Sequence, residues 1–145
     1  MSDPYSNRVL ELAADIPHIG RLDAPHASAH KVSRICGSEL TLDVKIGDAG
    51  RITDLGLEVQ ACALGQASAS VFARNAVGAD LQEIVAARDA LKAMLQAGGP
   101  PPSGRFAELE VLGPAAPYRQ RHGSILLAYE AAIAALTQDE KAAAR

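Results

Sequence analysis

The residues of this chain best suited to chemistry are its two cysteines, Cys36 and Cys62. Cysteine in a reducing compartment is more often buried, metal-bound or reactive than disulfide-bonded, and the thiolate is the reactive form. Cys36 precedes Gly37, which indicates a tight turn and a sulfur near the surface. Cys62 is expected where a strand meets a helix, and backbone N–H groups at a helix start favour a thiolate. The alternative is that both are buried as small hydrophobic residues, as free cysteines often are.

A histidine could be a third metal ligand beside the two cysteines, but the sequence supports this role less strongly. His122 lies beside Arg119 and Arg121 near the start of the last expected helix, where a histidine is more often solvent-exposed than a ligand. The cysteines do not form CxxC pairs, and the sequence has neither a phosphate-binding loop nor a nucleophile elbow. From the residues alone, metal binding, thiol chemistry and simple burial all stay open.

Three strands are expected around the cysteines. Apolar and polar residues alternate over 40–46 and again over 52–59, with a change of parity that predicts a bulge near Asp54. A further strand over 29–35 completes a small antiparallel sheet with one solvent-facing side. The strand over 40–46 follows the first cysteine, and its partner precedes the second. An antiparallel pair therefore brings both cysteines to one end of the sheet.

Helices dominate the rest of the chain. Asp80 and Glu83 have the spacing of a capping box, and the helix that they open ends at Gly98. Helices are expected over 7–14, 63–76, 81–97, 106–109 and 119–138, with loops over 17–28 and around Gly113, Pro114 and Pro117 and a frayed tail over 138–145. Strands followed by helices predict an α+β fold with helices packed mainly on one face of the sheet.

The overall composition narrows the class of protein. With 145 residues, the chain is expected to form one domain over 1–145, with a core of about 5–137, that needs no disulfide. A net charge of −3 without a basic stripe argues against nucleic-acid binding. No apolar stretch reaches the ~20 residues of a membrane span, and the first residues lack a signal-peptide pattern. We therefore expect a cytoplasmic protein that binds neither nucleic acid nor membrane.

Four short motifs occur in the order found in a known family. They are CGS at 36–38, LGL at 55–57, ACALGQASAS at 61–70 and HGSIL at 122–126. This order resembles the U-type iron–sulfur cluster assembly scaffolds, namely the NifU N-terminal domain and its IscU and SufU relatives. The likeness spans roughly residues 5–137, and its most specific part is the cysteine followed by a helix of small residues.

The resemblance implies a set of ligands. Family members place three cysteines and an aspartate around one site, and two of these cysteines match Cys36 and Cys62. Ser38 stands at the aspartate position and Gly123 at the third cysteine position, while His122 matches a histidine found in some members. The implied donors are therefore Cys36, Cys62 and His122, with Ser38 a weak fourth. Zinc and [2Fe–2S] clusters prefer four donors, so a homodimer, an external thiol or a partner's ligand could complete the set.

The resemblance also implies a function. The expected protein is a scaffold rather than an enzyme, and it binds iron or a [2Fe–2S] cluster, with zinc as the alternative metal. Its expected partners are a cysteine desulfurase and acceptor apoproteins. The missing third cysteine leaves the receipt of sulfur from the desulfurase in question. Two alternatives remain: a degenerate member that regulates the assembly machinery without its own cluster, and a thiol-based sulfur carrier or enzyme using Cys62.

Overall fold

The computed structural model describes residues 3–143, with side chains described for 3–141. Four α-helices and three strands make up most of this part of the chain. They are α1 (Asn7–Ala14), β1 (Ala27–Ser33), β2 (Ser38–Ile46), β3 (Ile52–Gln60), α2 (Ala63–Asn75), α3 (Leu81–Ala97) and α4 (His122–Ala143). Three 3₁₀ helices connect them: η1 (Asp48–Gly50), η2 (Gly104–Ala115) and η3 (Arg119–Arg121).

The strands form one antiparallel sheet in the order β1-β2-β3. Between β2 and β3, Lys45 pairs with Asp54 but Ile46 pairs with Ile52, so Thr53 is an extra residue in β3. The predicted bulge near Asp54 is therefore confirmed. It lets Ile52 and Leu55 both face the core, although their spacing breaks a strict alternation.

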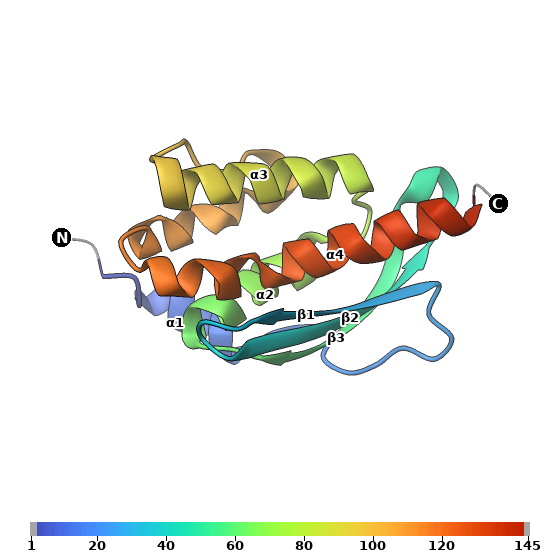
Figure 1. The fold of residues 1–145 in the computed structure, drawn as a ribbon, viewed down its shortest axis with the longest axis horizontal. Helices are drawn as coiled ribbons and strands as arrows, with labels where there is room; N and C mark the ends of the chain where they lie inside the picture. The colour runs from blue at the N-terminus through green and yellow to red at the C-terminus, as the bar shows by residue number, and fades with distance from the viewer. Residues whose placement is uncertain (1–2, 144–145) are drawn as a thin grey trace.

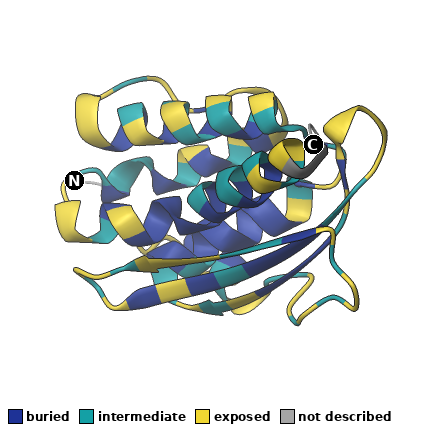
Figure 2. Cartoon of the chain, turned by 45° about the vertical axis from the view of Figure 1, so that its right-hand side comes forward, coloured by how far each residue is buried: buried dark blue, intermediate teal, exposed yellow. Residues whose placement is uncertain are grey.

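Helices cover one face of the sheet in two layers. Figure 1 shows α4 running along the sheet, with α3 stacked on the far side of α4. In Figure 2 the buried residues lie between the sheet and the helices, while the outward faces of the helices are exposed. The predicted α+β class, with its short first helix and long last helix, is confirmed. None of the helices in residues 3–143 has the length and hydropathy that a membrane span requires.

The sequence predicted that the other face of the sheet would be open to solvent, but the structure shows that part of this face is covered. The segment before β1 pairs with β3 through Gly20 and crosses the sheet at Asp43, which is fully buried. This carboxylate accepts hydrogen bonds from the Arg21 guanidinium at 2.7 and 2.9 Å, from Leu22 N at 3.0 Å and from Ser28 Oγ at 2.6 Å. The bonds from Arg21 outweigh the effect of burial and lower the Asp43 pKa to about 2. The alternation of apolar and polar residues along the strands does not predict that the segment before β1 lies across this face.

Several boundaries differ from the predictions. The first strand covers Ala27–Ser33 where 29–35 was expected, and α4 begins at His122, after η3, where a helix from 119 was expected. The structure continues η2, which is kinked at Phe106, through Gly113 and Pro114, where a short helix followed by a loop was expected. A spacing of three is the period of a 3₁₀ helix, so this segment can bury a single row of side chains. The buried residues are Phe106, Leu109, Leu112 and Ala115. The last helix, expected to end near residue 138, continues to Ala143, where alanine favours helix; residues 144–145 lie outside the described part.

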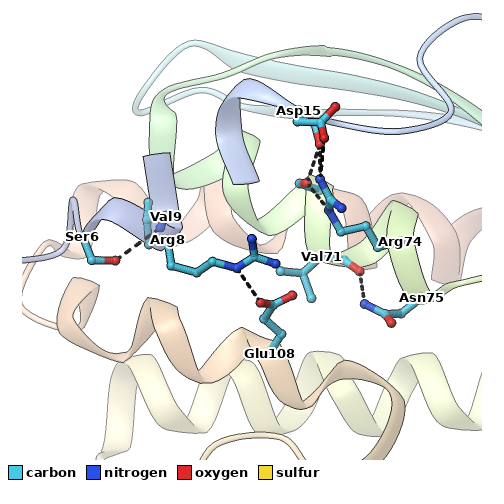
Figure 3. Close-up of polar contacts among 9 residues, drawn as sticks. Ser6, Arg8, Val9, Asp15, Val71, Arg74, Asn75 and Glu108 are labelled. Atoms are coloured by element: carbon cyan, nitrogen blue, oxygen red, sulfur yellow. Dashed lines mark hydrogen bonds and ion pairs between the residues drawn. The ribbon is translucent and has the colours of Figure 1, made fainter. Parts of the chain in front are cut away.

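Polar contacts fix α1 against α2 (Figure 3). Ser6 caps α1 by accepting from Val9 N at 3.3 Å. At the other end, the Arg74 guanidinium donates to the backbone oxygen of Asp15 and lies 3.3 Å from its carboxylate. Since Arg74 belongs to α2, this contact helps to set the position of the helix that begins directly after Cys62.

Candidate functional site

The two cysteines lie at the same end of the sheet. Cys36 belongs to the turn that joins β1 to β2, and Cys62 is the N-cap residue of α2. Because Glu39 pairs with Gln60, the residues just beyond this pair remain neighbours after the strands end. Figure 1 shows the β1–β2 turn beneath the start of α4. Both thiols are free and half-buried.

Serine hydroxyls connect the two thiols. The Cys36 thiol donates to Ser33 Oγ at 3.3 Å and lies 3.5 Å from Ser38 Oγ. The Cys62 thiol donates to Ser124 Oγ at 3.6 Å, and Ser124 Oγ in turn donates to Ser38 Oγ at 2.9 Å. An unbroken series of contacts therefore runs from Cys36 through Ser38 and Ser124 to Cys62. We call Cys36, Cys62, Ser33, Ser38 and Ser124 the thiol–hydroxyl cluster.

The middle of this cluster is sealed from solvent. Ser38 and Ser124 are each only 2% exposed, so their hydroxyls depend on protein partners for hydrogen bonds. Gly65 makes the close packing there possible, since a Cβ at this position would lie 2.1 Å from Ser124 Oγ. Because Gly65 has no side chain, the Ser124 hydroxyl that accepts from Cys62 has room to lie against α2. Helix α2 and helix α4 meet at this point.

The surroundings favour the thiolate of Cys36. Partial burial tends to raise the Cys36 pKa, but hydrogen bonds from Ser33, Ser38 and Ser124 together outweigh it, so the pKa is lowered. Hydroxyls that accept from the thiol in its neutral form can rotate and donate once it ionises. The surroundings of Cys36 therefore favour the thiolate, which is the form that binds metal.

Gly123 stands beside the cluster on the surface. A Cβ added at this glycine would lie 2.5 Å from Ser33 Oγ and 3.3 Å from Ser33 Cβ. The Ser33 hydroxyl, which also contacts Cys36, therefore fills the space that a side chain at position 123 would need. An open cavity of about 610 Å³ adjoins Gly123 on the side of Ile35 and Arg119.

His122 does not join the cluster through any of the described contacts. It is 5% exposed, so the expectation of a solvent-exposed histidine is wrong. Its Nε2 lies 2.9 Å from the carbonyl oxygen of Ala116 and 3.3 Å from that of Ala115, both at the end of η2. The imidazole therefore lies against the end of η2. Among residues 3–141, no three His, Cys, Asp or Glu side chains are grouped so that they could hold a metal ion.

Sequence reasoning thus identified three members of the cluster and missed two. The structure brings Cys36, Cys62 and Ser38 together, as expected. The missed residues are Ser33 and Ser124. Ser33 pairs directly with Ser38 across β1 and β2, so an exact strand register would have revealed it. Ser124 lies inside the HGSIL motif, but nothing in the local pattern shows that its side chain reaches the thiols.

Two thiolates and neighbouring neutral hydroxyls fit part of an iron or zinc coordination shell. Tetrahedral zinc and each iron of a [2Fe–2S] cluster take four ligands, mostly sulfur in the case of iron. Cys36 and Cys62 can supply two of them, and Ser33 Oγ and Ser38 Oγ are neighbouring oxygens, 3.3 and 3.5 Å from the Cys36 sulfur. The donor set is therefore suited to a thiophilic metal but is short of a full shell within one chain.

Comparisons with known proteins agree with this arrangement. The family model described as the NifU-like N-terminal domain matches residues 4–138. The crystal structure of a nitrogen-fixing NifU-like protein (N-terminal) from Brucella abortus is 46% identical, with a TM-score of 0.92 and 94% of each chain covered. A crystal structure of a SUF-system scaffold protein from Fervidobacterium islandicum shares the fold, with a TM-score of 0.82 at 22% identity, covering 92% of this chain and 96% of that one.

Two curated relatives carry the name iron–sulfur cluster assembly scaffold protein IscU. The protein from Streptococcus pyogenes is 28% identical over 125 residues, which cover 86% of this chain and 77% of that protein. The protein from Thermotoga maritima is 32% identical over 80 residues, which cover 55% of this chain and only 56% of that protein. With the family model matching nearly its whole length, this chain belongs to the NifU-like N-terminal domain family of iron–sulfur cluster assembly scaffolds.

Proposed function

We propose that this chain is a scaffold that binds iron or a [2Fe–2S] cluster through Cys36 and Cys62 and passes it to acceptor apoproteins. The observation that carries the proposal is the series of contacts that joins the two thiols through Ser38 and Ser124. Thiols that lie far apart in the sequence are linked by serine hydroxyls at a half-exposed site. Such a site can accept a metal from solvent and release it again.

The chemistry of the site favours a soft metal. The lowered Cys36 pKa increases the fraction of thiolate, which is the form that binds iron and zinc. Ser38 offers a neutral oxygen where other family members carry a carboxylate, so it adds no charge to the bound metal. We expect the cargo to be held less firmly than at a site with four charged donors. His122 would contribute only after its ring leaves the Ala115 and Ala116 carbonyls.

The proposal extends to partners and organisation. The family implies a cysteine desulfurase as the source of sulfur and acceptor apoproteins as the destination of the cluster. We further propose that the chain works as one domain in the cytoplasm. In this role it holds and delivers cargo and does not catalyse a reaction of its own.

Anaerobic reconstitution tests the proposal. The purified chain is incubated with ferrous iron and sulfide, and visible absorbance and bound iron are measured. We expect a coloured protein, with colour and iron lost in Cys36→Ala and in Cys62→Ala. Ser68→Ala is the matched control: Ser68 is also buried, but its hydroxyl donates to the Ile125 carbonyl and not to a thiol. His122→Ala shows whether the imidazole enters the shell.

Other outcomes would point elsewhere. A folded protein that stays colourless and metal-free under all conditions would contradict the proposal and support a regulatory member without its own cluster. Retention of zinc in preference to iron would change the cargo but not the site. A substrate-dependent adduct confined to Cys62 would favour a thiol carrier.

A further inference from the structure

Strand β1 has a sheet partner on one side only. It pairs with β2 along its whole length, and within the described residues no other strand lies beside it. His30, Lys31 and Val32 are exposed, and none of the described backbone hydrogen bonds to turns or loops involves residues 28–33. A strand at the edge of a sheet presents N–H and C=O groups that pair readily with another extended segment. The outer edge of β1 therefore has backbone groups to offer a further strand.

A groove runs between this edge and helix α4. It consists of two adjoining cavities of about 690 and 290 Å³, and both are lined by Lys31 and Glu130. Figure 1 shows α4 lying along the sheet. The apolar residues of α4 that line the groove are Leu126, Leu127, Ile133 and Ala134. Such a surface can bury the apolar side chains of an extended segment that lies between the strand and the helix.

The uncompensated charges of the groove are positive. Glu130 forms an ion pair with Arg88 of α3 at 3.1 Å, which offsets its negative charge. Lys31 and Lys141 are exposed, and neither makes an ion pair with another described residue. Since the charges of two binding surfaces are complementary, this groove suits a segment that carries acidic side chains.

Lys31 occupies an unusual position for a charged residue. It pairs with the buried Leu40, so it lies on the face of the sheet that the helices cover. A lysine on the inner side of an edge strand keeps copies of a protein from pairing through their edges. A second copy would bring its own Lys31 and Lys141 into the groove and add like charge. An acidic segment instead gives Lys31 an opposite charge, so the same residue disfavours one occupant and favours the other.

We propose that this groove docks an extended segment of a partner protein that carries both apolar and acidic side chains. The segment adds a strand beside β1 through backbone hydrogen bonds. Side chains of a strand point alternately to its two sides, so every second one faces α4. There the apolar side chains pack against the helix, and the acidic ones pair with Lys31 and Lys141.

The groove ends beside the thiol–hydroxyl cluster. Ser33 and Gly123 line its smaller cavity, and Ser33 Oγ accepts from the Cys36 thiol. Neither cavity is lined by Cys36 or Cys62, so docking does not require bound cargo. A partner anchored in the groove is held next to the place where the cargo would bind. The inference goes beyond the proposed function and holds or fails without it.

Peptide binding to the metal-free chain tests the proposal. The probe is a fluorescent synthetic peptide with valine and glutamate on one face of the strand and threonine on the other, and fluorescence anisotropy measures its affinity. The control probes are the same peptide with lysine in place of glutamate and a version interrupted by proline. We expect only the acidic, uninterrupted peptide to bind, with an affinity that falls as salt is raised. Amide hydrogen exchange should slow in β1 and stay unchanged in β3.

Variants of the groove separate charge from shape. Lys31→Glu should weaken binding of the acidic peptide by about tenfold or more and strengthen binding of the lysine peptide. Lys92→Glu is the matched control, because Lys92 is an exposed lysine of α3 that lines neither cavity. Ala134→Phe fills the groove without a change of charge and should also abolish binding. Circular dichroism checks that each variant keeps the fold.

Each other result has a definite meaning. Failure of every peptide to bind would overturn the proposal and leave Lys31 only as a guard of the sheet edge. Equal binding to Lys31→Glu and to the parent chain, or protection in β3 in place of β1, would overturn the assigned groove. A doubled mass that Lys31→Glu alters would make a second copy the occupant and contradict the acidic partner. Because no iron is present, none of these results bears on reconstitution of the cluster.

Discussion

The Oγ of Ser124, on α4, donates a 2.9 Å hydrogen bond to the Oγ of Ser38, the first residue of β2. This bond crosses from the helical layer to the sheet and links the hydroxyl that contacts Cys62 to the one that contacts Cys36. The two thiols therefore share one polar network in an otherwise apolar junction. The first predictions concern this network.

Replacing Ser124 by alanine should loosen the link between the two thiols. Ser38 and Cys62 would each lose a partner, and we expect the free energy of unfolding to fall by about 1–2 kcal/mol. Alkylation of Cys62 should become faster. Ser68→Ala should lower stability by a similar amount but leave the alkylation rate unchanged, since its hydroxyl contacts no thiol. Urea titration and mass spectrometry of the alkylated chain provide both measurements. Equal alkylation rates in the two variants would contradict the prediction.

Cys36 should ionise at a lower pH than an ordinary thiol. Its folded-state pKa is lowered because hydrogen bonds outweigh partial burial, so its contribution to stability is present above the unfolded pKa and is lost as pH falls through the folded pKa. The rate of alkylation against pH, measured in Cys62→Ser so that one thiol reacts, gives the midpoint. Ser33→Ala should move this midpoint upward. A midpoint at or above that of a free thiol would rule out the proposed stabilisation.

Gly65→Ala should strain the contact between α2 and α4. The new Cβ would lie 2.1 Å from Ser124 Oγ and 2.9 Å from Ala61 Cβ, and we expect a loss of about 1–3 kcal/mol. Combining it with Ser124→Ala should recover part of the loss, because the closest clashing atom is gone. A double-mutant cycle by chemical denaturation measures the coupling, and strictly additive losses would show that the two residues do not interact.

A third thiol should be restorable at position 123. In Gly123→Cys alone, the new Cβ would lie 2.5 Å from Ser33 Oγ, so we expect lowered stability and poor metal uptake. Adding Ser33→Gly removes the obstructing side chain. The double variant should bind more iron per chain than the parent, because it offers a third thiol. Iron content and native mass test this; Ser33→Gly alone is the control and should gain no iron.

The buried Asp43 should govern acid stability. Its pKa of about 2 in the folded state lies below the unfolded value, so its contribution of roughly 2 kcal/mol is present above the unfolded pKa and is lost as pH falls toward 2. Asp43→Asn should lower the free energy of unfolding at neutral pH by about 2–4 kcal/mol, because Arg21 loses its partner. The melting temperature, measured at a series of pH values from neutral to acid, should change less with pH in this variant than in the parent chain. An unchanged profile would mean that other carboxylates dominate.

Local chemistry made much of the fold predictable. The alternation in β2 and β3, the parity change at the bulge and the Asp80 cap, which accepts from Glu83 N at 2.9 Å, all depend on residues close in sequence. The order of strands and helices, together with the family motifs, placed Cys36 and Cys62 at one end of the sheet. These features follow from backbone geometry, which neighbouring residues largely set.

Features that depend on packing between distant segments were not predictable in the same way. His122 was expected in solvent but is buried, because η2 returns to cover it. The face of the sheet expected to be open is crossed by the segment that contains Arg21, which pairs with Asp43. In both cases the deciding neighbour lies in a segment whose path the local pattern does not specify.

The order of elements, the two cysteines and the absence of a third followed from the amino-acid sequence alone. Tertiary structure decided which hydroxyls surround the thiols, that Ser33 takes the space beside Gly123, and that both sulfurs remain half-exposed. The physical reason is that a hydrogen bond between side chains requires atoms within a few ångströms, and residues 86 positions apart reach that distance only when helix and sheet are packed together.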